Sequence, residues 1–157
     1  MTSPHLDQWP LSDLKYRRSE VTAFVGSGDA VWERVALEVL LWKVKTASGF
    51  VVDSPGPVSP GDRVVVTARL CGLSVVEPVE VVDVVQEPDR SGFSYRTRPG
   101  HPVDGEEAFL VHRSGDEVHL TIRSLTRAAP QQPWRLLFPL LLIAQRIIQR
   151  RYLRALR

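Results

Sequence analysis

The stretch GFSYRTRPGHPVDGEEAFLV, residues 92–111, has two segments of alternating apolar and polar residues around the sequence PGHP. Alternation with a period of two is typical of a strand with one buried face, and proline with glycine marks a turn. The stretch therefore predicts an antiparallel hairpin, and we place the centre of its turn at Pro102. The predicted partners across the hairpin are Thr97 with Glu107 and Tyr95 with Phe109.

One face of this hairpin collects six residues, because successive side chains of a strand point to opposite sides. The aromatic and aliphatic members mark it as the buried face. Glu107 is then a carboxylate on an otherwise apolar wall. The six residues are Phe93, Tyr95, Thr97, Glu107, Phe109 and Val111.

Five further segments have strand character and are separated by turn signals. In one of them the apolar alternation changes phase between Val81 and Val82, which predicts a β-bulge that bends the strand. With the hairpin they give a curled antiparallel sheet of about six or seven strands. The segments are residues 19–25, 50–52, 63–70, 74–86 and 117–125.

Residues 30–44 have apolar side chains at helical spacing, including Trp32 and Trp42, and predict one amphipathic helix or two short ones. Asp29 is the predicted N-cap. Residues 131–157 predict a long C-terminal helix. Pro139 either kinks this helix or marks its true beginning.

The C-terminal helix has a wide apolar side by its sequence. One stripe is formed by Trp134, Leu137, Phe138, Leu141, Ile148 and Tyr152, and we expect Leu136, Leu140, Ile143 and Ile147 to widen it. A sheet that is polar on one face must cover the other, and the helices are the available cover. We therefore predict an α+β fold of one domain over residues 1–157, with residues 1–15 irregular.

Composition and charge limit the partners. The 157 residues carry a net charge of +2, but residues 131–157 hold six arginines and no acid, so the remainder has a net charge of −4. We expect a solvated arginine face, no specific binding of nucleic acid, and at most weak contact with anionic surfaces. The sequence leaves the oligomeric state open. The single cysteine excludes an internal disulfide and suggests a cytoplasmic location.

The segment from Gly92 to Val111 resembles the signature of the domain-of-unknown-function family nineteen-ninety, whose members tend to read GF-x-YGT-x-PGHP-x-x-GEE-x-F. Tyr16, the tryptophans of the first helix and the SLTRAAP stretch before the last helix are also similar. This chain departs from the pattern at Arg96, where the family usually has glycine. The resemblance implies a START-like, helix-grip fold of the SRPBCC superfamily. It implies no activity.

Glu107 is the leading candidate for catalysis, with Tyr95 and His101 assisting. A carboxyl group on an apolar wall has a raised pKa unless it is paired, which suits a general acid or base. The alternative is a structural Glu107, satisfied by neighbouring donors. His101 could guard a pocket mouth or merely tolerate its turn. We expect Phe93, Thr97, Phe109, Trp42, Trp134 and Phe138 to contact a ligand.

The sequence has no nucleophile elbow, phosphate-binding loop or metal-ligand spacing, so we expect no metal and no cofactor. Three functions fit it. The first is binding of a small, largely apolar molecule between the sheet and the C-terminal helix. The second is an enzyme of the cyclase, dehydratase or isomerase type that uses the same cavity. The third is an interaction module that acts through the arginine-rich helix.

Overall fold

The sheet of this computed structural model, which describes residues 1–11, 14–54, 56–70 and 72–157, is antiparallel throughout. Its order is β1-β7-β6-β5-β4-β3-β2, so only the pair β1 and β7 joins strands distant in the sequence. The strands are β1 (Arg17–Ser27), β2 (Phe50–Val52), β3 (Arg63–Leu70), β4 (Leu73–Glu87), β5 (Arg90–Thr97), β6 (Val103–Ser114) and β7 (Glu117–Ala128).

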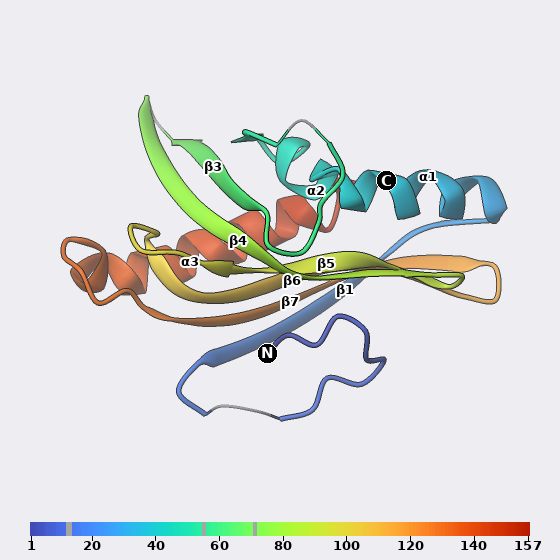
Figure 1. The fold of residues 1–157 in the computed structure, drawn as a ribbon, viewed down its shortest axis with the longest axis horizontal. Helices are drawn as coiled ribbons and strands as arrows, with labels where there is room; N and C mark the ends of the chain where they lie inside the picture. Colours follow the sequence, from blue (N-terminus) through green and yellow to red (C-terminus); the bar gives the residue numbers. More distant parts are fainter. Residues whose placement is uncertain (12–13, 55, 71) are drawn as a thin grey trace.

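The helices lie on one side of the sheet, which curls around α3 (Figure 1). They are α1 (Asp29–Leu40), α2 (Lys43–Thr46) and α3 (Trp134–Tyr152). The predicted α+β, helix-grip architecture is confirmed.

The predicted bulge in β4 is also confirmed. Val81 pairs with Tyr95 and Asp83 pairs with Ser94, which leaves Val82 as the additional residue. The bulge changes which side chains face the helices: before it Val79 and Val81 point inward, and after it Val84 packs against the core. This bend lets a 15-residue strand follow the curl of the sheet.

Two helices occupy the region where the sequence allowed one or two. Trp42 has a φ of 61°, and this left-handed residue separates α1 from α2. The predicted N-cap at Asp29 is wrong, because Gly28, with a φ of 96°, precedes the helix and Asp29 lies in its first turn. Asp29 instead accepts a hydrogen bond from Arg113 at 3.0 Å.

The last helix, α3, begins directly after Pro133 and continues through Pro139 without a break. Its inner side chains are half-buried, and Tyr152 is only 2% exposed. We expected four further apolar residues of α3 to be buried, and this expectation is wrong. The helix covers a cavity along one narrow side, and its opposite side is exposed to solvent. The exposed residues there are Leu136, Leu140, Ile143 and Ile147.

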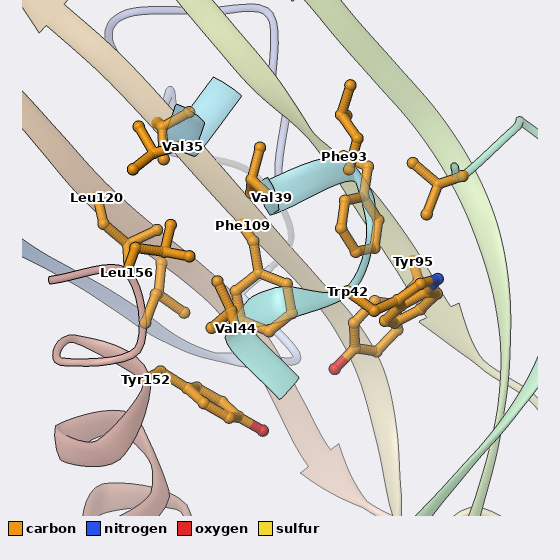
Figure 2. Close-up of a cluster of buried hydrophobic side chains, with 14 of the residues drawn as sticks. Val35, Val39, Trp42, Val44, Phe93, Tyr95, Phe109, Leu120, Tyr152 and Leu156 are labelled. Carbon is orange, nitrogen blue, oxygen red and sulfur yellow. The ribbon is translucent and has the colours of Figure 1, made fainter. Parts of the chain in front are cut away.

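Aromatic rings form the centre of the core (Figure 2). Phe93 lies between Trp42 and Phe109, with ring centroids 4.7 and 5.8 Å away, both edge to face. Phe109 in turn meets Tyr152 at 5.3 Å. Such edge-to-face pairs add to the hydrophobic gain from burying the rings. The core therefore joins α1, the sheet and the end of α3.

The N-terminal segment crosses the other face of the sheet (Figure 1), and its residues 1–11 form no helix or strand. Arg123 on that face is 2% exposed and donates hydrogen bonds to the carbonyls of Ser3 and Asp7 at 2.8 and 2.9 Å. Its Nε also donates to Glu20 at 2.6 Å. A buried guanidinium is thus satisfied by the segment that covers it.

Candidate functional site

A cavity of about 140 Å³, partly open to solvent, lies between the inner face of the sheet and α3. Its wall is mostly apolar. Strands β2 to β7 supply one side, while α3 supplies Leu141, Ala144 and Ile148 as a roof. Polar side chains also line the cavity. Six of them form a group that we call the polar cluster: Lys45, Glu77, Tyr95, His101, Glu107 and Ser124. Thr97, Glu106, Thr126 and Gln145 line the wall outside this cluster.

Lys45 is the cation of this cluster. The left-handed turn at Trp42 redirects the chain, and the side chain of Lys45 in α2 is only 5% exposed. Its Nζ lies 3.6 Å from Glu107 Oε2 and 3.7 Å from Glu77 Oε2. It also lies 4.6 Å from the ring centre of Phe50, within the range of a cation–π contact. One ammonium group is therefore shared between two carboxylates.

Glu107 is the carboxylate of the pair that accepts hydrogen bonds on both of its oxygens. The hydroxyl of Tyr95 donates to its Oε2, and the hydroxyl of Ser124 donates to its Oε1 at 3.3 Å. Burial, with the charge of Glu107 next in importance, raises the pKa of Tyr95 well above its usual value of 10.0. Tyr95 therefore stays protonated and holds Glu107 in place as a donor.

Glu77 is the less satisfied carboxylate. Its nearest polar partners are Lys45 Nζ at 3.7 Å and His101 Nε2 at 4.0 Å, both long for hydrogen bonds. Burial raises the pKa of Glu77 above 4.5, against the lowering effect of Lys45, and the charge of Glu107 raises it further. This carboxyl group has spare capacity for a hydrogen bond and faces the cavity.

His101 is buried and neutral. Burial, assisted by Lys45, lowers its pKa to about 3. The backbone N–H of Val103 donates to Nδ1 at 3.1 Å, so the ring proton resides on Nε2, which faces Glu77. The structure thus places His101 at the cavity wall and not in an open turn.

The predicted hairpin register is wrong by two residues. Tyr95 pairs with Glu107 and Phe93 with Phe109, because the turn reaches its tightest point earlier than Pro102. A shift of two keeps every side chain on its predicted face. Arg96, the departure from the family pattern, is on the other face and donates to Glu80 at 2.7 and 3.0 Å.

Four of the nine predicted site residues lie at the cavity: Glu107, Tyr95, His101 and Thr97. The oxygen of Thr97 accepts a hydrogen bond from the N–H of Gly105 at 3.0 Å. The structure places the other five away from the cavity wall. Phe93, Phe109 and Trp42 are buried in the core behind it, while Trp134 and Phe138 are half-buried at the far end of α3.

Three residues of the polar cluster, Lys45, Glu77 and Ser124, were missed from the sequence, although Lys45 and Glu77 each left a signal. Lys45 follows Trp42 by three residues and so occupies a position where the apolar stripe of the first helix would continue. Glu77 shares the two-residue alternation of Val75 and Val79, which are apolar and inward. A charge at an apolar position of a periodic pattern was the signal in both cases.

Among the described residues, no group of three or more histidine, cysteine, aspartate or glutamate side chains could hold a metal ion. The polar cluster combines one cation, two carboxylates and neutral donors.

Comparisons with known proteins bear on the fold and the family. A family model described as "Domain of unknown function (DUF1990)" matches residues 4–155. A UPF0548 protein of Deinococcus radiodurans is 36% identical over 147 residues, covering 84% of this chain and 72% of that protein.

Solved structures share the architecture at low sequence identity. The hypothetical protein jhp0584 from Helicobacter pylori aligns over 90% of this chain and 84% of its own, with a TM-score of 0.58 and 14% identity. Ara h 8.0201 aligns over 87% of this chain and 95% of its own, with a TM-score of 0.53 and 11% identity. These similarities concern the fold, whereas the match over residues 4–155 concerns descent: the chain belongs to the DUF1990 family.

Proposed function

We propose that this protein binds a small, largely apolar molecule in the cavity between the sheet and α3. The observation that carries the proposal is a concave, mostly apolar wall with a few polar side chains, among them the polar cluster. Ligand sites of proteins are typically concave and mostly apolar, with a few polar groups that fix orientation. A volume of about 140 Å³ is close to that of an engineered apolar cavity of about 150 Å³ that accepts benzene. The enclosed part therefore fits one ring or a short chain.

The polar cluster favours a ligand with a hydrogen-bond donor at one end. Glu107 accepts hydrogen bonds from Tyr95 and Ser124, whereas the contacts of Glu77 within the described residues are the long ones to Lys45 and His101. A hydroxyl or amine of the ligand would satisfy Glu77 and compensate for the water lost on binding. A purely hydrocarbon ligand would leave this carboxyl group buried with those long contacts alone, at a cost in free energy.

An enzyme that uses the same cavity is the second candidate. The observation that favours it is the raised pKa of Glu77 at a cavity wall, beside Lys45 and Glu107. A carboxyl group whose pKa is moved toward neutrality can donate or accept a proton during a cyclisation, dehydration or isomerisation. In this reaction class Glu77 or Glu107 would be the acid or base, assisted by Tyr95 or His101.

The binding proposal is tested with a fluorescent apolar probe, 8-anilinonaphthalene-1-sulfonate, on two variants. Ala144→Phe fills the cavity from its roof, whereas Leu37→Phe adds a larger side chain on the exposed side of α1, where Leu37 is 57% exposed. We expect Ala144→Phe to weaken probe binding at least about tenfold and Leu37→Phe to leave it unchanged. Equal binding by both variants would contradict the proposed cavity.

Native mass spectrometry of protein purified from its own host then identifies what the cavity holds. Glu77→Gln and Glu107→Gln distinguish the two candidates once that molecule is known. Loss of a positioned acid or base lowers the rate of turnover by roughly 10²–10⁴-fold. Unchanged turnover in both variants would exclude the acid–base role. If the two variants change only the affinity for the molecule, the result supports binding without catalysis.

A further inference from the structure

A row of large apolar side chains on the outer side of α3 is turned toward solvent. Its members follow one another at spacings of four, three and four residues, which places them on a single stripe of about 16 Å. Soluble proteins rarely expose a contiguous apolar patch without a partner for it. The exposed fractions are 77% for Leu136, 63% for Leu140, 56% for Ile143 and 51% for Ile147.

Arginines surround the end of this stripe. At 100° per residue, Arg150 and Arg151 lie on either side of the line through Ile143 and Ile147, and Arg154 continues that line. All three are exposed, as is Arg146 one turn earlier. Within the described part of the chain none of these four forms an ion pair, and α3 contains no acidic residue to neutralise them.

A polar groove beside α3 adds to this positive surface. It lies between the start of β1 and the helix, and its walls include Arg17, Arg18 and Arg146. Arg18 is turned to the N-terminal segment, where it lies over the ring of Trp9, 3.7 Å from the ring centre, and donates hydrogen bonds to the carbonyls of Trp9 and Pro10. The groove beside α3 therefore offers the guanidinium groups of Arg17 and Arg146 at a hollow large enough for a phosphate.

We propose that the outer side of α3 docks onto an anionic membrane surface. The apolar stripe would lie in the boundary between head groups and acyl chains, and the arginines would contact lipid phosphates and carboxylates. Helices with an apolar side and a basic margin bind lipid surfaces in this way, lying parallel to the membrane. No helix in the described ranges is long and apolar enough to cross a membrane, so the contact is peripheral.

Two other occupants fit the surface less well. A second copy of the chain could cover the apolar stripe, but a symmetric dimer would bring two arginine-rich faces together at the cost of charge repulsion. Nucleic acid would satisfy the arginines but not the four exposed leucines and isoleucines. An anionic lipid surface matches both the charge and the apolar side chains.

The docking is tested by sedimentation of the full chain with vesicles of phosphatidylcholine alone or with about 30% phosphatidylserine. We expect binding to the anionic vesicles, weakened as salt rises from about 0.05 to 0.5 M. The variant Arg150→Gln/Arg151→Gln should bind about 25-fold more weakly, because each arginine near such a surface contributes about a factor of five. Leu140→Ser/Ile143→Ser should lose at least about tenfold.

Matched controls come from other surfaces of the molecule. Leu37→Ser/Leu41→Ser changes one exposed leucine of α1 and another directly after its end, and Arg63→Gln/Arg96→Gln removes the same charge from the sheet. Both controls should bind as the unmodified protein does.

Three results would overturn the proposal. Equal binding to neutral and anionic vesicles would exclude the role of charge, and unchanged binding by Leu140→Ser/Ile143→Ser would exclude the apolar stripe. Absence of vesicle binding by the unmodified protein would also refute it, because that measurement depends on no variant. In that case, a dimer that dissociates in Leu140→Ser/Ile143→Ser would identify a second copy of the chain as the occupant. Tight binding of nucleic acid would identify nucleic acid instead.

Discussion

Lys45→Met removes the cation shared by Glu77 and Glu107. The side chains of the three residues are 5%, 16% and 14% exposed, so the two carboxylates lose their cation in a site largely closed to water. Breaking a buried ion pair by removal of one partner typically costs about 3–5 kcal/mol of unfolding free energy. In a chain of this size that corresponds to a fall in Tm of roughly 10 °C.

The loss should depend on pH, and the direction follows from Glu77. Its pKa is raised in the folded protein, so the folded state binds a proton more tightly than the unfolded state does. The contribution of Glu77 to stability is then fully present below pH 4.5 and is lost as pH rises through its folded pKa. Lys45 lowers the pKa of Glu77, so its removal raises that pKa further. The pH range over which the contribution of Glu77 is lost then becomes wider. Lys45→Met should therefore be much less destabilised near pH 5 than near pH 7.5.

The assay is urea denaturation of both proteins at each pH, with the exposed neighbour Lys43→Met as control. The double variant Lys45→Met/Glu77→Gln should recover part of the loss at neutral pH, because it also removes one of the stranded carboxylates. If Lys45→Met is no less stable than Lys43→Met, or loses the same free energy at both pH values, the described electrostatics of the polar cluster are incorrect.

Two further predictions concern the cavity wall. His101, with a pKa of about 3, should stay neutral from pH 8 down to about pH 5, so its ring NMR shifts should show no protonation step near pH 6.5; a titration there, as in an exposed histidine, would contradict its burial. Gly105→Ala should lower the unfolding free energy by about 3 kcal/mol in urea denaturation, because a Cβ there would lie 1.8 Å from the carbonyl oxygen of Leu125. Gly56→Ala, with open space around it, is the control, and equal stability of the two variants would refute the close approach.

Much of the fold could be predicted from periodicity. The two-residue alternation predicted the strands, the bulge at Val82 and the inward face that carries Tyr95 and Glu107. It could not give the register of the hairpin, because pairings that differ by two residues place the same side chains on the same face. The position of the turn decides between them, and the sequence PGHP allowed more than one.

The polar cluster was harder to predict, because its members come from distant parts of the chain. Lys45 reaches Glu107 only because the left-handed Trp42 turns α2 toward the sheet. Tryptophan rarely adopts a positive φ, so the sequence gives no sign of this turn. The outer side of α3 was misjudged for a related reason. Its sequence is apolar on two sides, and only the cavity beneath it determines which side is buried.

The bulge in β4 has a consequence for how relatives of this protein can diverge. Before the bulge the strand contributes Val75 and Glu77 to the cavity, and after it Val84 joins the core. The opposite end of the sheet, covered by α1, is closely packed, whereas the end under α3 is hollow. Substitutions in the hollow end leave the packed end intact, so selection can alter the molecule that is recognised while the folding free energy is kept. Tyr95, Thr97, His101 and Glu107 line the cavity but belong to the family pattern. We therefore expect sequence variation among relatives to concentrate on the apolar part of the cavity wall, with these polar residues and the aromatic centre nearly constant.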